Sequence, residues 1–240
     1  MPRTKFMDIY EDLKDKIERN VFEYQQLIPS ENTLVKEYNC SRNTIRRAIA
    51  ELVSKGYLQT KHGKGVRVIY QDFKQNEYMF GETETFKEFA QRNDKKHRTE
   101  VVLYEEVTAD EQIQEITSMP IGTKLYHLQR VRYLDGNPVI MDHNYFRADV
   151  VKGLTVEIAE DSIYEYLEKE LNHRVVTAKR QMIVEKTTDL DEKYLNMDGY
   201  NCVVVVTSYI YNEDGVMFER TQSRHTPGNF VFFDQTQQRQ

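Results

Sequence analysis

The hydrophobic residues of the N-terminal part recur with the spacing that is typical of amphipathic helices. Residues 5–19 form the first such segment. A short second helix is expected after Pro29 with Ser30 as its N-cap, because the residue that precedes a proline is restricted to extended geometry. Ser41 is placed to cap a third helix, which Gly56 would end. The apolar positions of the three helices are Phe6, Ile9, Tyr10, Leu13 and Ile17; Leu34, Val35 and Tyr38; and Ile45, Ala48, Ile49, Leu52 and Val53.

After Gly56 the polar and apolar residues alternate instead. The stretch "YLQTKHGKGVRVIY" resembles a two-stranded hairpin, and its tip "HGKG" holds glycines that can adopt positive φ. Three helices followed by a hairpin describe a winged helix-turn-helix, which is a DNA-binding form. Residues 1–70 are therefore predicted to fold as a winged helix-turn-helix domain.

The rest of the chain mixes helix patterns with strand patterns. "TFKEFAQR" is predicted to be a helix with a capping box formed by Thr85 and Glu88. "SIYEYLEKEL" is predicted to be another, with Ser162 and Glu165 as its box. "ADEQIQEITSM" is a third predicted helix.

Strand patterns lie between and after these helices. "TKLYHLQRVRYLDGNPVIMDHNYF" is predicted to be a hairpin that turns at Asp135–Gly136. Further strands are expected at "TEVVLYEEV", "RVVTAKRQMIVEK", "CVVVVTSYIYN", "VMFERTQSRH" and "NFVFFD". Consecutive hairpins with helices between them predict an α+β fold with a largely antiparallel sheet. Residues 82–240 are expected to form this second domain, and the polar, aperiodic stretch 71–81 is the expected linker.

The two predicted domains differ in charge. The chain of 240 residues has a formal net charge of −6. Residues 1–70 contain 13 Lys and Arg against 9 Asp and Glu, whereas residues 71–240 contain 20 against 30. Such asymmetry indicates that the two parts have different partners.

Several features indicate the cellular compartment. The longest apolar run, Val203–Val206, is far shorter than a membrane span, and the N-terminus lacks the apolar core of a signal peptide. Cys40 and Cys202 fit no metal-binding or redox spacing. We therefore expect a protein of the reducing cytoplasm that binds no metal and no cofactor.

Basic residues gather on the third predicted helix and in the hairpin. Arg42, Asn43, Arg46 and Arg47 lie off the apolar stripe, in the N-terminal half that a recognition helix presents to base edges. Arginine can bond guanine O6 and N7 bidentately, while Thr44 and the helix N-terminus suit phosphate. The alternative is a solvated basic face on a structural domain. The candidate DNA-binding residues from this pattern are Ser41, Arg42, Asn43, Thr44, Arg46, Arg47, His62, Gly63, Lys64 and Gly65.

The second domain carries no motif of an enzyme. It has no CxxC, HExxH or GxSxG motif and no phosphate-binding glycine loop. The helix starts at Thr85 and Ser162 are possible anion sites, although a capping box alone is more often structural.

Two groups of polar side chains are expected to share strand faces. Arg130 and Arg132 are two apart on a strand, so they point to the same side and could bind a phosphorylated ligand. Their alternative role is pairing with acids of this acidic domain. A second face would carry groups able to hold sugar hydroxyls or simply lie exposed, namely Glu219, Thr221, Ser223 and His225.

The N-terminal motifs resemble a known family. "IPSE", "SRNTIRRAIAELVSKGYL" and "HGKGVRV" occur in order over residues 5–69, as in the DNA-binding domain of GntR-type bacterial transcription regulators. The resemblance implies that Arg42, Thr44 and Arg46 work in the major groove and that the wing glycines lie near the minor groove. Asn32 is a further DNA-binding candidate, and it departs from the charged residue that relatives often carry there.

The C-terminal motifs resemble the effector domain of the HutC subfamily, called UTRA, whose fold is similar to chorismate lyase. They are "VIMDHNYF", "DSIYEYLEKEL", "MDGYNCVVVVTSYIY" and "TQSRH", and regulators of trehalose operons are the most similar members. The resemblance implies that residues 82–240 bind a sugar phosphate such as trehalose 6-phosphate and form a homodimer. The implied effector-binding residues are Thr85, Phe86, Arg130, Arg132, Ser162, Tyr164, Glu219 and His225.

These observations predict a dimeric repressor of a sugar-utilisation operon. The repressor would bind double-stranded operator DNA and release it when a sugar phosphate binds. One alternative is a regulator that responds to another phosphorylated sugar or to an amino sugar. Others are a sugar-phosphate enzyme, since the chorismate lyase fold catalyses, and an architectural DNA binder without a ligand.

Overall fold

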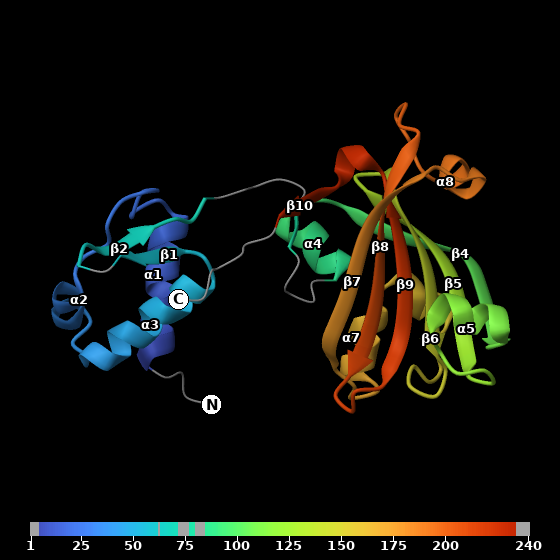
Figure 1. The fold of residues 1–240 in the computed structure, drawn as a ribbon, viewed down its shortest axis with the longest axis horizontal. Helices are drawn as coiled ribbons and strands as arrows, with labels where there is room; N and C mark the ends of the chain where they lie inside the picture. Colours follow the sequence, from blue (N-terminus) through green and yellow to red (C-terminus); the bar gives the residue numbers. More distant parts are fainter. Residues whose placement is uncertain (1–4, 62, 72–76, 80–84, 234–240) are drawn as a thin grey trace. The chain divides into compact units, whose positions relative to one another are not determined.

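A computed structural model of the chain describes residues 5–61, 63–71, 77–79 and 85–233. The chain divides into two compact units; the described residues up to 71 belong to the first, and those from 77 to 233 belong to the second. Figure 1 shows the N-terminal unit as three helices with a small sheet, and the C-terminal unit as a large sheet with short helices. No helix in the described part of the chain is long and apolar enough to cross a membrane.

The N-terminal unit is a winged helix-turn-helix, as predicted. The apolar faces of its helices meet in one core, where Leu13, Leu34, Ile45, Leu52 and Leu58 are almost completely buried. Its elements are α1 (Lys5–Glu18), α2 (Glu31–Glu37), α3 (Arg42–Ser54), and the antiparallel strands β1 (Leu58–Lys61) and β2 (Gly65–Val68).

Local capping explains where these helices begin and end. The hydroxyls of Ser30 and Ser41 accept hydrogen bonds from the backbone N–H groups of the third residues after them, as expected of N-caps. After α3 the chain reverses at Gly56, whose φ of 78° a residue with a side chain rarely adopts.

One six-stranded antiparallel sheet forms the body of the C-terminal unit. Its strand order is β4-β5-β6-β9-β8-β7, so the predicted largely antiparallel α+β fold is confirmed. Asp135 and Gly136 have φ of 50° and 83°, which is the type I′ geometry of a tight hairpin between β5 and β6. The strands are β4 (His97–Thr108), β5 (Lys124–Leu134), β6 (Asn137–Arg147), β7 (Val175–Lys186), β8 (Cys202–Asn212) and β9 (Met217–His225).

Short helices cover both faces of this sheet. Ala159 of α6 and Leu167 of α7 pack with Phe146 on one face, while Leu195 after α8 packs with Met141 on the other. The helices α6 and α8 were not predicted, because five or six residues are too few to show a helical period. The helices of this unit are α4 (Phe86–Arg92), α5 (Glu111–Thr117), α6 (Val156–Glu160), α7 (Ile163–Lys169) and α8 (Asp189–Tyr194), with the 3₁₀ turn η1 (Pro227–Asn229).

The stretch predicted as a linker contains a strand. β3 (Glu77–Met79) pairs in parallel with β10 (Val231–Phe233), in a small sheet separate from the large one. The three residues of β3 are too few to show an alternating pattern, so the sequence did not predict a strand in this polar stretch.

The two predicted capping boxes have different outcomes. Thr85 and Glu88 form the complete box at the start of α4. At α7 the Ser162 hydroxyl accepts from the backbone N–H of Glu165, but the Glu165 carboxylate does not return the bond. It accepts instead from Lys87 and Lys169, because two ammonium groups compete for it. The predicted box at Ser162 is therefore only half formed.

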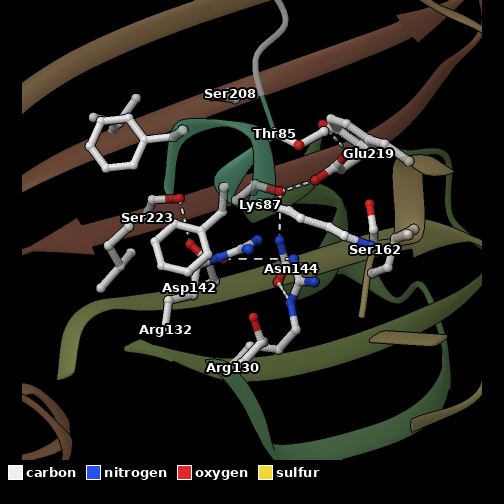
Figure 2. Close-up of a pocket in the computed structure, with 18 of the residues that line it drawn as sticks. Thr85, Lys87, Arg130, Arg132, Asp142, Asn144, Ser162, Ser208, Glu219 and Ser223 are labelled. Atoms are coloured by element: carbon white, nitrogen blue, oxygen red, sulfur yellow. Dashed lines mark hydrogen bonds and ion pairs between the residues drawn. The ribbon is translucent and has the colours of Figure 1, made fainter. Parts of the chain in front are cut away.

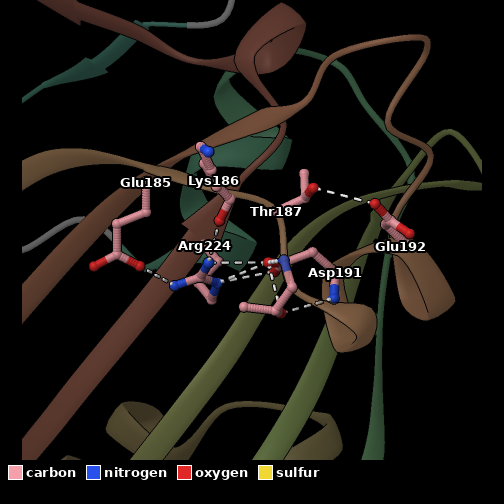
Figure 3. A network of polar contacts seen from close by, with 7 residues as sticks. Glu185, Lys186, Thr187, Asp191, Glu192 and Arg224 are labelled. Carbon is pink, nitrogen blue, oxygen red and sulfur yellow. Dashed lines mark hydrogen bonds and ion pairs between the residues drawn. The ribbon is translucent and has the colours of Figure 1, made fainter.

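A buried ionic cluster anchors α8 to the sheet (Figure 3). The Arg224 guanidinium of β9 donates to both Asp191 oxygens, with its Nε at 2.9 and 3.1 Å, and to Glu185 at 2.6 Å. Asp191 is completely buried and also accepts from the Thr188 backbone N–H at 2.8 Å. The same carboxylate thus caps α8 and binds the arginine.

Candidate functional site

The polar residues predicted to bind DNA lie together on the first turns of α3. Arg42, Asn43, Arg46 and Arg47 are exposed, and Thr44 is half-buried. Ser41 is the N-cap, and its hydroxyl also lies 2.8 Å from that of Thr44. The N-terminal half of α3 therefore has the polar face that a recognition helix presents to DNA.

Helix α2 holds two of these arginines in defined positions. The Nη2 of Arg42 donates to Asn32 Oδ1 at 2.7 Å. The Nε of Arg46 donates to both oxygens of Glu31, at 3.0 and 3.2 Å. Glu31 was not predicted as part of this surface, although its place in the quoted "IPSE" motif was the available signal. A guanidinium held through Nε keeps its two terminal nitrogens for a guanine edge.

Arg47 differs from these two arginines. Its guanidinium carbon lies 3.8 Å from the centre of the Phe6 ring, which is a cation–π contact. Arg47 therefore fastens α1 to α3 as well as adding positive charge to the surface.

The predicted wing residues form the turn between β1 and β2. Gly63 and Gly65 have φ of 71° and 104°, so both positions need glycine, and Lys64 between them is exposed. His62 lies outside the described residues. The Arg67 guanidinium, next to this turn, donates to the Gln25 carbonyl oxygen.

Arg46→Ala is expected to weaken binding to the specific operator by about 1–3 kcal/mol, because its guanidinium is predicted to bond a guanine edge bidentately. Arg47→Ala is the comparison variant: its guanidinium stacks on Phe6 and adds general charge, so any loss of affinity should be equal for operator and unrelated duplex. Fluorescence anisotropy with operator and with unrelated duplex measures both. An equal loss of Arg46→Ala affinity for the two duplexes would show that Arg46 contacts phosphate alone.

A cavity of about 200 Å³ opens between the large sheet and the helices α4 and α7. All eight residues predicted to contact an effector line it, so the structure brings together side chains from four separate elements. They are Thr85 and Phe86 at the start of α4, Arg130 and Arg132 on β5, Ser162 and Tyr164 at the start of α7, and Glu219 and His225 on β9.

One end of the cavity is cationic (Figure 2). Arg130 and Arg132 point to the same side of β5, as predicted, and both approach Asp142 on β6. The Nε of Arg132 donates to Asp142 Oδ2 at 2.5 Å, and the Nη2 of Arg130 lies 3.6 Å from the same oxygen. The two arginines therefore share one side of the strand, as predicted, and they also pair with an acid, which was the alternative.

The two arginines differ in how their donors are used. Arg130 is 4% exposed, and it donates from Nε to Asn144 at 3.0 Å and from Nη1 to the Ala159 carbonyl at 3.2 Å. Among the described residues, the terminal nitrogens Nη1 and Nη2 of Arg132 have no hydrogen-bond partner. Arg132 can therefore give two donors to an anion, while Arg130 mainly supplies charge.

The protonation states of this cluster follow from burial and charge. Burial lowers the pKa of Arg130 to about 10, so the side chain stays positive at pH 7. Burial alone would raise the pKa of Asp142, but the charges of Arg132 and Arg130 outweigh it and hold that pKa at about 2. The cluster therefore contains two positive charges and one negative charge.

Glu219 is the centre of the other end of the cavity, which is rich in hydroxyl groups. It accepts hydrogen bonds from the Tyr164 hydroxyl at 2.7 Å and from Thr221, and Thr221 accepts from Asn144 at 2.7 Å. Burial raises the pKa of Glu219, and also raises the pKa of Tyr164. A continuous hydrogen-bonded chain thus joins Asn144, at the cationic end, to the Glu219 carboxylate, which lines the cavity.

Aromatic rings complete the wall. The Phe86 ring lies 5.0 Å from the Arg132 guanidinium carbon, and the His225 and Phe230 rings are 4.9 Å apart. Burial lowers the pKa of His225 to about 4, so its imidazole is neutral at pH 7. Flat apolar surface beside polar groups is typical of a pocket for a small polar molecule.

Lys87 ties together the two helices at the cavity edge. Its ammonium lies 3.0 Å from an oxygen of Asp161 and 3.0 Å from one of Glu165. The hydroxyls of Thr85 and Ser162 accept from the backbone of their own short helices, so both are N-caps as well as lining residues. Among the described residues, no group of three or more His, Cys, Asp or Glu side chains could hold a metal ion.

Several lining residues were not predicted as effector-binding residues. Asp142 and Asn144 lie on β6, directly across from Arg130 and Leu128 of β5. The turn at Asp135–Gly136 sets this register, so it was the sequence signal that could have identified both residues. Thr221 and Ser223 do share a face with Glu219, as predicted. Arg180 on β7 and Ser208 on β8 belong to a distant hairpin, and no local pattern relates them to the cavity.

A winged helix and an α+β unit with a polar cavity, joined in one chain, are typical of a one-component transcription regulator, in which one domain binds DNA and the other a ligand. Residues 7–68 match the bacterial regulatory proteins of the gntR family, and residues 92–230 match the UTRA domain. The chain belongs to the GntR family and carries the UTRA effector domain of its HutC subfamily. It is a transcriptional regulator that binds DNA through its helix-turn-helix and a small-molecule effector through its UTRA domain. The family is not one of enzymes, which excludes the sugar-phosphate enzyme.

One relative and two solved structures are similar to the chain. The HTH-type transcriptional regulator TreR of Bacillus subtilis (strain 168) is 36% identical, over 98% of both chains. The effector binding domain of the B. subtilis trehalose repressor (TreR) has 35% identity and a TM-score of 0.54, covering 60% of this chain and 99% of that one. The possible transcriptional regulator YydK of Bacillus subtilis subsp. subtilis str. 168 has a TM-score of 0.80 at 18% identity, covering 98% and 100%, and supports the fold alone.

Proposed function

We propose that the protein is a cytoplasmic repressor of a sugar-utilisation operon and that a sugar phosphate releases it from its operator. The observation that carries the proposal is the cavity, where Arg130 and Arg132 form a cationic end and Glu219 lies at a hydroxyl-rich end. A phosphate group suits guanidinium donors, and a sugar suits paired carboxylate and hydroxyl groups beside aromatic rings.

Trehalose 6-phosphate is the first effector to test. The relative with 36% identity over the whole chain is named TreR, and the solved effector domain with 35% identity is described as that of a trehalose repressor. A row of lining residues across the sheet supports an effector of more than one sugar ring. Asn144 and Arg180 lie in one cross-strand row, separated by three strand spacings of about 4.8 Å each.

We propose that the regulator acts as a homodimer. Two copies related by a two-fold axis would place two recognition helices on operator half-sites about one helical turn apart. Effector binding would then favour a dimer geometry that spaces the helices wrongly. Its effect is limited by the difference in effector affinity between the two geometries.

A thermal-shift screen tests the sensor function. Trehalose 6-phosphate and other sugar phosphates, at concentrations far above their Kd, are expected to raise the Tm of the UTRA unit, because a ligand of the native state stabilises it. Free trehalose serves as the control without a phosphate. Failure of every sugar phosphate to raise the Tm would contradict the proposed function.

A further inference from the structure

Asp142 lies where a bound phosphate would be expected to meet only positive charge. Its carboxylate is 1% exposed and lines the cavity beside both guanidiniums. Its Oδ1 accepts from the Ser223 hydroxyl at 2.6 Å, and its Oδ2 accepts from Arg132 Nε (Figure 2). An anion that reaches the terminal nitrogens of Arg132 therefore also approaches a carboxylate.

The surroundings of Asp142 keep this carboxylate ionised. Arg130 and Arg132 face it from β5, and Ser223 donates to it from β9. Burial lowers the pKa of His225 on β9 and of His143 on β6, so both rings are neutral at pH 7 and add no positive charge. The other charged or titratable groups that line the cavity are Glu219 on β9, Tyr164 of α7, His97 on β4, Arg180 on β7, and Lys87 of α4, which is paired with Asp161 and Glu165.

An ionised carboxylate can only accept hydrogen bonds. A phosphate monoester has a second pKa near 6, so it exists in solution as a monoanion with one P–OH group or as a dianion without one. The P–OH group can donate to Asp142. The dianion, and likewise a sulfate ester, would place an unprotonated oxygen against the carboxylate, where like charges repel without water to screen them.

The charge of the cluster favours the same form. Two guanidiniums and one carboxylate leave a net charge of one positive unit, which a monoanion balances. A site built from arginines alone would contain no acceptor for a P–OH group, so it would not reject the dianion or the sulfate ester.

We propose that Asp142 is a specificity-determining residue that makes the pocket bind the monoanionic, protonated form of a phosphate ester and reject the sulfate ester. This inference rests on the proposed function, because it assumes that the cavity binds a sugar phosphate. The phosphate group would donate its P–OH proton to Asp142 in a hydrogen bond while its other oxygens accept from Arg132.

Calorimetry on the full wild-type chain tests the inference. The probes are the 6-phosphates of trehalose, glucose and N-acetylglucosamine, each compared with the corresponding 6-sulfate. We expect the 6-phosphate to bind at least ~10-fold more tightly than its 6-sulfate, because the sulfate leaves Asp142 facing a like charge. Affinity for the phosphate should fall by ~10-fold per pH unit above pH ~6, with uptake of about one proton at pH 7.5, because the bound form keeps a proton that the free dianion lacks.

Asp142→Asn removes the negative charge with little change of shape. It is expected to reduce the preference for phosphate over sulfate to about 2-fold or less, and to abolish the proton uptake. Asp149→Asn is the matched control, since Asp149 pairs with Arg147 and does not line the effector cavity, and it should keep both properties.

The outcomes separate the inference from the proposed function. If a 6-phosphate binds but the 6-sulfate binds equally well, or no proton is taken up, the inference is wrong and the sensor function stands. If no sugar phosphate binds at all, the inference and the proposed function are both wrong. The wild-type experiments suffice even if Asp142→Asn fails to fold.

Discussion

Arg132→Ala is expected to weaken the binding of a sugar phosphate by ~100-fold, which corresponds to about 3 kcal/mol. Arg132 is the arginine whose terminal nitrogens are available in the cavity, whereas Arg130 donates to Asn144 and to the Ala159 carbonyl. Charge-assisted hydrogen bonds to phosphate are among the strongest that a side chain makes. Calorimetry with the sugar phosphate that gives the largest thermal shift measures the loss.

Arg147→Ala is the control for this change. It removes the same charge from the neighbouring strand, but Arg147 pairs with Asp149 and does not line the effector cavity. Its sugar-phosphate affinity should equal that of the wild type. Operator binding without effector should be unchanged in both variants. Wild-type affinity in Arg132→Ala would show that the phosphate lies elsewhere.

Asp191→Ala is expected to destabilise the C-terminal unit by about 3–5 kcal/mol, because it leaves the buried guanidinium of Arg224 without its main partner (Figure 3). The substitution also removes the side-chain cap at the start of α8. Urea unfolding followed by circular dichroism measures the transition of this unit.

Asp189→Ala is the matched control for the Asp191 prediction. Asp189 is an exposed acid in the first turn of the same helix, so its loss should cost no more than about 1 kcal/mol. A comparable small loss in both variants would mean that the Arg224 cluster contributes little to stability.

The stability of the C-terminal unit should also depend on pH. Burial alone would raise the pKa of Asp191, but Arg224 outweighs it and lowers that pKa, so the contribution is present above pH ~4 and is lost as the pH falls.

The N-terminal unit was predictable because its signals are local. The apolar residues of α1 and α3 recur with a helical period, and Ser30 and Ser41 cap their helices where the sequence places them. The Asp135–Gly136 turn likewise specified the β5–β6 hairpin, and through it the common face of Arg130 and Arg132.

The parts that were missed depend on contacts between distant segments. Asp142 on β6 accepts from Arg132 on β5 and from Ser223 on β9, and only the register of the folded sheet brings these three strands together. Arg180 lines the cavity from β7, an edge strand of the large sheet. The order of strands in a sheet cannot be read from the period of hydrophobic residues. Glu31 holds Arg46 across two helices for the same reason. Short elements such as α6 and β3 are fixed by packing rather than by their own sequence.

Release of operator DNA by a sugar phosphate is the most direct test of the proposed function. An operator selected from random duplexes is bound by wild-type protein and by Arg132→Ala at one stated salt concentration, because phosphate contacts make affinity strongly salt-dependent. Sugar phosphates are then added in turn, beginning with trehalose 6-phosphate. We expect one of them to lower the operator affinity of the wild type by ~5–150-fold and to leave Arg132→Ala bound. Unchanged wild-type affinity with every sugar phosphate would contradict the account.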